Sequence, residues 1–169
     1  MSQDFYMGNP NLKKVGTEIQ FTQEQVKEYL KCKDDPVYFA RNYIKIISLD
    51  EGIVPFKMWD FQEELIESFH ENRFNIAKLP RQTGKSTTCV SYLLHYILFN
   101  DNVNVGILAN KLSTARDLLG RLQLAYEQLP LWLQQGIVVY NKGSMELENG
   151  SKILAASTSA SAVRGMSFN

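Results

Sequence analysis

The sequence predicts an α/β fold in which a parallel central sheet is flanked by helices and preceded by an N-terminal helical segment. Two short apolar runs, Phe74–Leu79 and Val103–Ala109, are typical of buried strands, and a helix-forming stretch follows each of them. Crossovers of this kind bring the carboxyl ends of parallel strands to one edge of the sheet, where ligands bind. The turn after the first run therefore lies where a ligand is expected.

That turn ends in Gly84-Lys85-Ser86-Thr87, and a helix is expected over Thr88–Phe99. A strand, a tight loop with Gly-Lys-Ser and a helix together are the context of a phosphate-binding loop. In such a loop the backbone N–H groups at the start of the helix attract phosphate. The lysine reaches the β- and γ-phosphates, and the serine hydroxyl ligates Mg²⁺. The pattern predicts a phosphate-loop NTPase that binds ATP and Mg²⁺, although Leu79 replaces the first glycine of the full motif.

The residues before this loop divide into three predicted parts. Residues 1–20 are polar and are expected to form a flexible arm. Residues 21–55 are expected to form the helical segment, because Thr22 and Gln25 offer a capping box, and Pro36 starts a second helix after Asp35. Residues 49–55 read as a turn-rich connection. Residues 56–169 then form the front half of the ATPase domain.

A helix from about Trp59 to Glu71 is indicated by its apolar spacing and carries Gln62. A glutamine amide donates and accepts hydrogen bonds at once, which suits the edge of adenine. The alternative is a solvated helix glutamine, and the local sequence alone favours that alternative.

The remaining elements follow from apolar periodicity and turn residues. After Ser157, Arg164 beside Gly165 is either an arginine finger for phosphoryl transfer or an ordinary loop arginine. The predicted elements are a helix at Ser113–Gln128, a short helix at Leu129–Leu133, a strand at Ile137–Tyr140, and a hairpin whose type I′ turn is Asn149-Gly150.

Composition narrows the class of protein. The 169 residues carry no net charge, so no global field draws the chain to DNA. Cys32 and Cys89 lack metal-ligand spacing and read as free thiols. No apolar stretch is long enough to cross a bilayer. No apolar run ending in an acidic pair follows Lys85, so the chain is expected to be the front portion of a longer protein.

Several short motifs together resemble one known family, the large terminase subunit of tailed bacteriophages, most closely the T-even type. The resemblance runs from about Tyr6 to the last residue. The residues that carry it are Met7-Gly8, Pro10-Asn11-Leu12-Lys13, Cys32-Lys33-Asp34-Asp35, Val37-Tyr38-Phe39-Ala40, Asp60-Phe61-Gln62, Arg81-Gln82-Thr83-Gly84-Lys85, Gly106-Ile107-Leu108-Ala109, Lys111, Gly136-Ile137-Val138, Asn141-Lys142-Gly143-Ser144 and Val163-Arg164-Gly165.

The resemblance implies an ATP-driven motor that packages viral DNA into a procapsid. In this family the phosphate loop typically lacks the first glycine, and Gln62 would correspond to an adenine-recognising glutamine. Arg81 and Arg164 compete for the role of the arginine that acts on the γ-phosphate. The implied catalytic residues are Arg81, Lys85 and Arg164; the implied nucleotide-binding residues are Gln62, Arg81, Gln82, Thr83, Gly84, Lys85, Ser86 and Thr87, with Ser86 on the metal.

The same resemblance implies partners and a location. The partners are double-stranded viral DNA, the portal protein and the small terminase subunit, with a homo-oligomeric ring on the portal as a further expectation. No membrane partner is expected, and the location is the host cell cytoplasm, at the procapsid during packaging. The acidic strand and the nuclease domain would come after Phe168, so the fragment alone is expected to be inactive.

Two other functions stay open. One is a superfamily 2 helicase-like DNA translocase, which also has a glutamine upstream of its phosphate loop. The other is a non-catalytic nucleotide-binding or docking module that recruits packaging proteins through its N-terminal arm. Under the docking hypothesis, deletion of residues 1–20 abolishes partner binding and leaves nucleotide binding intact.

Overall fold

The protein is described by a computed structural model that covers residues 4–48, 50–158 and 168. The predicted loop containing Arg164 lies outside these residues. Along the chain the elements are η1 (Tyr6–Gly8), α1 (Gln23–Asp34), α2 (Pro36–Tyr43), β1 (Lys45–Ser48), β2 (Gly52–Pro55), α3 (Asp60–Glu71), α4 (Lys85–Phe99), β3 (Asn104–Ala109), α5 (Leu112–Glu127), β4 (Ile137–Tyr140), β5 (Ser144–Leu147) and β6 (Lys152–Ser157).

The main sheet is mixed rather than parallel. Its strand order is β3-β6-β5-β4, and only β3 and β6 run parallel. The other neighbours, β4 with β5 and β5 with β6, are antiparallel. The mixed α/β class is thus confirmed, while the parallel sheet is limited to one pair, because short turns join β4, β5 and β6 as a meander.

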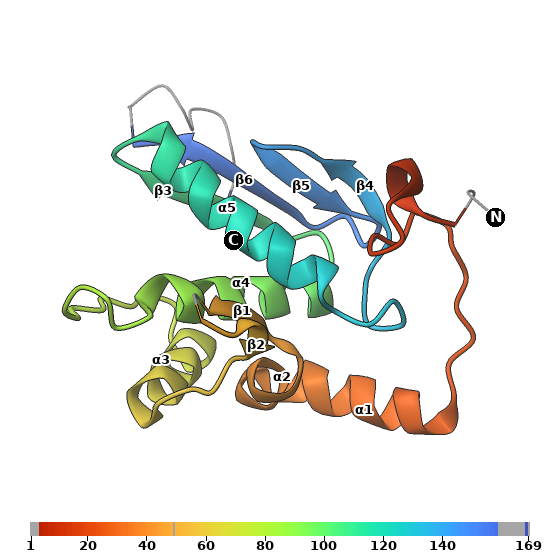
Figure 1. The fold of residues 1–169 in the computed structure, drawn as a ribbon, viewed down its shortest axis with the longest axis horizontal. Coiled ribbons are helices and arrows are strands. Elements are labelled where there is room, and N and C mark those ends of the chain that lie inside the picture. The colour runs from red at the N-terminus through yellow and green to blue at the C-terminus, as the bar shows by residue number, and fades with distance from the viewer. Residues whose placement is uncertain (1–3, 49, 159–167, 169) are drawn as a thin grey trace.

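The helices lie in layers against this sheet (Figure 1). Helix α5 packs against β3 and β6, and α4 packs against α5. On the other side of α4 lie α2 and α3, and α1 packs on α2. The buried centre between the layers is apolar and includes Phe39, Ile66, Leu94, Leu119 and Tyr126. Helix α4 is therefore the element that joins the sheet layer to the N-terminal helices.

The predicted helix starts are confirmed at two positions. Thr22 and Gln25 form a reciprocal capping box at the start of α1, with the Gln25 N–H 3.2 Å from the Thr22 hydroxyl and the Thr22 N–H 3.0 Å from the Gln25 amide oxygen. Asp35 caps α2 through the Tyr38 N–H at 2.8 Å, with Pro36 in the first turn. Both caps satisfy N–H groups that a helix leaves free.

The predicted strand at Phe74–Leu79 is wrong. These residues form no strand, and the side chains of Phe74 and Ile76 are 84% and 100% exposed. A strand is stable only when its backbone groups pair with a neighbour. Among the described residues, the segment has no ladder partner: the sheet ends at β3 without reaching it.

A two-stranded antiparallel sheet, β1 with β2, overlaps residues 49–55, where the sequence predicted a turn-rich connection. Strands β1 and β2 pair antiparallel, with Ile46 opposite Val54. The pairing starts before the predicted connection, and its side chains do not alternate cleanly between apolar and polar. The periodicity on which strand prediction depends is therefore missing at this position.

Two further turns differ from their predictions. Residues 131–133 form a turn and not a short helix, with the Leu133 N–H donating to the Pro130 carbonyl at 2.9 Å. In the β5–β6 hairpin only Gly150 has a positive φ, +80°, whereas a type I′ turn requires it at Asn149 as well. The Asn149 amide instead donates to the carbonyl oxygens of Ile97 and Asn100, at 2.9 and 3.1 Å, so the hairpin is tied to the end of α4.

Residues 4–17 are docked rather than free, which corrects the predicted flexible arm for the part of it that is described. The Ile137 N–H donates to the Lys13 carbonyl at 2.8 Å, so this segment pairs with the outer edge of β4. Gln134, which is 3% exposed, accepts from the Lys13 N–H and donates to the Asn11 carbonyl. The composition is polar, but these polar groups bind one strand edge.

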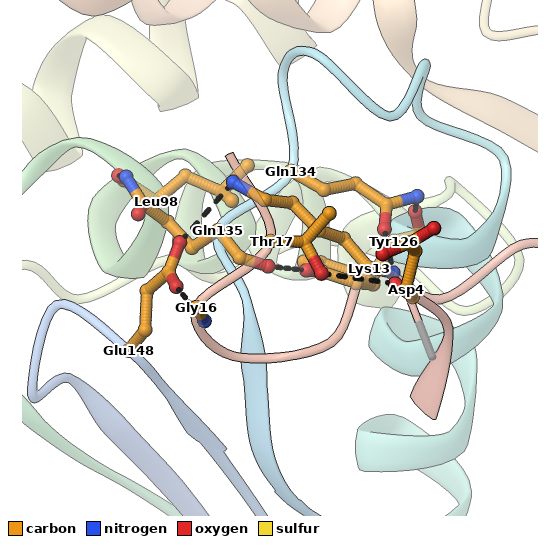
Figure 2. A network of polar contacts seen from close by, with 9 residues as sticks. All are labelled: Asp4, Lys13, Gly16, Thr17, Leu98, Tyr126, Gln134, Gln135 and Glu148. Atoms are coloured by element: carbon orange, nitrogen blue, oxygen red, sulfur yellow. Dashed lines mark hydrogen bonds and ion pairs between the residues drawn. The ribbon is translucent and has the colours of Figure 1, made fainter. Parts of the chain in front are cut away.

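Glu148 fastens the same segment from the other side (Figure 2). Its carboxylate accepts from the Lys13 ammonium at 3.2 Å and from the Gly16 N–H at 3.1 Å. Burial raises the pKa of Glu148, but the N–H groups of Gly136 and Gly16 and the Lys13 ammonium outweigh this effect, and the pKa lies below its ordinary value. The ionised carboxylate thus stabilises the docked segment.

Replacing Glu148 by alanine is expected to loosen residues 4–17 by about 1–2 kcal/mol, because two charge-assisted hydrogen bonds are lost. Hydrogen exchange at Gly16 should rise about tenfold in this variant. Glu146→Ala is the matched control, since the Glu146 carboxylate pairs with Lys152 on the same hairpin, at 2.7 Å. Equal exchange in the two variants would show that Glu148 does not hold the segment.

Both cysteines are free thiols, as predicted. Burial raises the pKa of Cys32 to about 12 and also raises the pKa of Cys89. Both sulfurs therefore stay protonated and unreactive at neutral pH.

In the described part of the chain, no helix has the length and apolar character needed to cross a membrane.

Candidate phosphate-binding site

The loop between residues 80 and 84 curls tightly before α4. Gln82 has φ +63° and Gly84 has φ +75°, and both values lie in the left-handed region. The Thr83 hydroxyl donates to the Pro80 carbonyl at 3.0 Å across the curl. Left-handed residues thus alternate with Thr83, whose φ is not positive. This alternation turns successive backbone N–H groups toward a common side and creates a concave site that suits an anion.

Helix α4 begins at this loop without a side-chain cap. Gly84 occupies the cap position, no side chain accepts a hydrogen bond there, and the first turn contains no acidic residue. Along α4, the first backbone N–H that donates to a backbone carbonyl of a described residue is that of Thr88, which donates to the Gly84 carbonyl at 3.0 Å. The first-turn N–H groups and the positive end of the macrodipole therefore face the loop, an arrangement that binds phosphate.

Lys85 folds back over the loop. Its ammonium donates to the carbonyl oxygen of Leu79 at 3.0 Å and to that of Pro80. These two carbonyls hold the charge inside the curl, next to the helix N-terminus. Two cationic contributions, the ammonium and the macrodipole, thus act on the same small space.

Gln62 connects α3 to this loop. Its amide oxygen accepts from the Trp59 N–H at 3.0 Å, and its amide nitrogen donates to the Thr83 carbonyl at 3.1 Å. The residue is 5% exposed. The solvated glutamine that the local sequence favours is therefore wrong, because α3 packs on α4 and buries the amide between them.

A cavity of about 310 Å³ opens beside the loop. Gln62, Gln82, Thr83, Gly84 and Thr87 contribute one wall. The other wall is mainly apolar and comes from β1, from the segment that joins β2 to α3, and from the first turn of α3. Its residues are Ile46, Phe56, Lys57, Trp59 and Phe61. A cavity of this size with flat aromatic side chains can accept a nucleobase.

The second wall was not identified from the sequence. Trp59 is 71% exposed, and its ring lies 6.2 Å from the Phe61 ring in an edge-on arrangement. An exposed tryptophan at the start of a helix, three residues before Gln62, was an available signal. Ile46 lies on a strand that was not predicted, so its approach to the loop required the tertiary structure.

The structure brings together most of the predicted nucleotide-binding residues. Gln62, Gln82, Thr83, Gly84 and Thr87 share the cavity, and Lys85 lies over the loop. Arg81 and Ser86 are exposed beside it and line no part of the cavity. Arg164 lies outside the described residues. The competition between Arg81 and Arg164 for the finger role is therefore not decided by this geometry.

Gly84 has no room for a side chain. A Cβ built at this position would lie 2.4 Å from the Gln62 amide nitrogen. Gly52 has the same φ of +75° with no atom within 4 Å. Alanine substitutions at Gly84 and Gly52 therefore separate two losses of stability: the one from a left-handed backbone and the one from a steric clash.

Gly84→Ala is expected to destabilise the fold by about 1 kcal/mol more than Gly52→Ala, because both variants have the backbone cost and only the first breaks the Gln62–Thr83 hydrogen bond. Urea unfolding of both variants measures the difference. Equal losses of stability would show that the Gln62 amide moves aside without cost.

Within the described residues, no group of three or more His, Cys, Asp and Glu side chains could hold a metal ion. Ser86 remains the predicted Mg²⁺ ligand, and its exposed hydroxyl lies in the first turn of α4.

A scan against protein-family models finds no match for this chain.

Proposed function

We propose that the chain binds a nucleoside triphosphate, with its phosphates on the loop Arg81–Thr87 and its base in the adjoining cavity, as the ATPase part of a DNA-packaging motor. The observation that supports the nucleotide site best is the uncapped start of α4, where the left-handed Gly84, the free first-turn N–H groups and Lys85 meet. Each of these features favours a polyphosphate anion over a neutral ligand.

Each residue of this site has a physical task. The N–H groups of the loop and of the first turn of α4 donate to phosphate oxygens. Lys85 neutralises charge on the β- and γ-phosphates, and for this its ammonium exchanges the Leu79 and Pro80 carbonyls for phosphate oxygens. Trp59 and Phe61 offer ring faces and edges to the base.

The chemistry that Mg²⁺ would supply here is positive charge that neutralises the charge developing on the phosphates. Ser86 is the protein group that would hold it from the start of α4. Arg81, exposed on the loop, or Arg164 supplies the positive charge that stabilises phosphoryl transfer, and such a finger is worth roughly 10³–10⁵ in rate.

The assignment to a packaging motor rests on the resemblance to phage large terminases. It makes double-stranded viral DNA the substrate that is moved, and the portal protein and the small terminase subunit the partners. It also proposes a ring of copies on the portal and a location in the host cell cytoplasm. A superfamily 2 helicase-like translocase is the second enzyme candidate, because it shares the glutamine and the phosphate loop.

The two motor proposals differ in the further segments that each requires. A terminase requires an acidic strand and then a metal-dependent nuclease domain, whereas a helicase requires an acidic motif and a second motor domain. A gene that also encodes a nuclease domain supports the terminase proposal, and one that encodes a second motor domain supports the helicase proposal. The docking-module candidate is weakened by the arm itself, since residues 4–17 already bind β4.

Calorimetric titration of the chain with Mg²⁺ and a non-hydrolysable ATP analogue tests the nucleotide site. We expect saturable binding, together with weaker binding of tripolyphosphate and no measurable binding of adenosine at the same concentrations. Circular dichroism on the same sample establishes that the chain is folded. A folded chain that binds neither the analogue nor tripolyphosphate would overturn the proposed site.

A further inference from the structure

A second cavity, of about 350 Å³, lies between β1 and the helices α4 and α5. Four successive residues, 44–47, line one side of it. The helices contribute the other side, which consists of Thr87, Val90, Ser91, Arg121, Leu124 and Ala125. Of all these residues, only Ile46 and Thr87 also line the cavity beside the phosphate loop. The second cavity is therefore a separate site.

This cavity borders an edge of β1 rather than one face of the strand. Successive side chains of a strand point to opposite faces, so four successive residues line one cavity only where the cavity follows the edge. One edge of β1 pairs with β2 in a two-stranded sheet. The other edge has no partner strand in the described part of the chain, and this free edge is the one that faces α4 and α5.

The ladder with β2 shows which backbone groups point toward the cavity. The Phe56 N–H donates to the Ile44 carbonyl at 2.9 Å, which makes these two residues a hydrogen-bonded pair. The register continues unbroken through β1, and antiparallel pairs alternate between hydrogen-bonded and non-hydrogen-bonded. Ile46 therefore turns its N–H and carbonyl toward β2, whereas Lys45 and Ile47 turn theirs toward the free edge.

The charge along this edge has one sign. Lys45 and Arg121 are exposed and line the cavity, and none of its lining residues is acidic. Among the described residues, neither cation has an ion-pair partner. The rest of the lining is mainly apolar and includes Ile44, Val90 and Leu124. The free edge thus combines backbone donors and acceptors, apolar side chains and positive charge.

We propose that the free edge of β1 and its cavity bind an extended segment of a partner protein, which adds as a third strand and carries acidic side chains between apolar ones. The backbone groups of Lys45 and Ile47 supply the main-chain hydrogen bonds, and the cavity receives alternate side chains of the segment. The acidic side chains meet Lys45 and Arg121. This inference goes beyond the proposed function and does not rest on the nucleotide site.

A second copy of this chain is a poorer occupant of the edge. Two copies paired through β1 would place both Lys45 side chains along one short ladder, where like charges are destabilising. The exposed apolar segment Phe74–Leu79 of another copy contains Lys78 and no acidic residue. Lysine on an edge strand is a common protection against self-pairing. The charge therefore favours an acidic partner.

The probe for this site is a blocked six-residue peptide of alternating valine and glutamate, titrated into isotope-labelled protein and followed by NMR. We expect saturable shifts at the amide signals of Lys45 and Ile47 that exceed the shift at Ile46, whose N–H already bonds to β2. The absence of saturable shifts at Lys45 and Ile47 would overturn the proposal.

Two N-methylated forms of the peptide test strand addition directly. In a strand the N–H groups of the valines point to one edge and those of the glutamates to the other. Methylation of one set therefore removes the donors that face β1, and methylation of the other set does not. We expect one methylated peptide to bind and the other to fail; equal binding by both would overturn strand addition.

Charge is tested on α5 with a matched pair of variants. Arg121→Glu is expected to weaken binding of the glutamate peptide about fivefold, because attraction is replaced by repulsion. Arg116→Glu makes the same change in charge at an exposed residue of the same helix that does not line the cavity, and it should bind nearly as the wild type does. Equal losses in the two variants would overturn the assignment to this cavity.

Two further outcomes identify a different occupant. A peptide of alternating valine and lysine should not bind, and binding as tight as that of the glutamate peptide would overturn the acidic preference. Spectra of the protein alone at several concentrations should show constant signals for Lys45 and Ile47. Signals that move with protein concentration would assign the edge to a second copy and overturn the proposal of a partner protein.

Discussion

Lys85→Ala is expected to weaken binding of the magnesium–ATP analogue by about a hundredfold, since hydrogen bonds to charged groups contribute about 1.5–3 kcal/mol each. The ammonium lies over the loop in the structure, held by the carbonyls of Leu79 and Pro80. Its removal takes away the one side-chain charge that is fixed inside the curl among the described residues. Calorimetry on wild type and variant measures the loss.

Two further variants separate charge from geometry. Lys85→Arg keeps the positive charge, but its planar fork does not fit a space shaped for an ammonium, so we expect intermediate affinity. Lys78→Ala is the control, because Lys78 is an exposed lysine before the loop. An unchanged affinity in Lys85→Ala would exclude the loop as the phosphate site.

Acid is expected to destabilise the fold through His95. This residue is 2% exposed on α4, and its Nε2 lies 2.9 Å from the Cys32 carbonyl at the end of α1. A carbonyl only accepts, so Nε2 carries the proton, and Nδ1 has no hydrogen-bond partner among the described residues. The rings of Phe39, Tyr92 and Phe99 lie around it.

Burial lowers the pKa of His95 to about 4, although its hydrogen bond to the Cys32 carbonyl acts in the opposite direction. The unfolded chain, with an ordinary histidine pKa near 6.5, binds the proton first. The contribution of neutral His95 is therefore complete above pH 6.5 and is lost as the pH falls toward 4. This loss lowers the free energy of unfolding by about 3 kcal/mol.

Urea unfolding at a series of pH values checks this expectation. His95→Phe should remove most of the fall between pH 6.5 and 4, because phenylalanine fits an aromatic environment and has no proton to bind. Since carboxyl groups also titrate in this range, the difference between variant and wild type is the quantity to compare. His70, an exposed histidine whose ring lies 6.3 Å from the His95 ring, also lowers the pKa of His95, so His70→Phe should reduce the fall without removing it. The same pH profile in wild type and His95→Phe would contradict the assignment.

The sequence predicted the helices around the site because their signals are local. Thr22 with Gln25 and Asp35 with Pro36 mark helix starts by contacts within one turn, and the structure has them. Gly84 was also assigned from local chemistry, and its left-handed φ agrees with that assignment. Features whose cause lies within a few residues can be recovered from the chain alone.

The remaining features depend on distant partners. Phe74–Leu79 has the composition of a strand, but strand formation depends on a neighbour, which composition does not specify. Gln62 looked solvated on its own helix, and only the packing of α3 on α4 brings its amide to Thr83. The arm looked flexible because Gln134 and Glu148, which bind it, lie more than a hundred residues away in the chain.

The segment Phe74–Leu79 also affects how the protein behaves as a sample. The side chains of Phe74 and Ile76 are exposed to solvent, and β3 is an edge strand of the sheet in the described part of the chain. Exposed apolar chain and an edge strand are each able to pair with another copy. Concentrated preparations should therefore scatter light increasingly with time, and dilute samples or a charged residue at position 76 should keep the chain monodisperse.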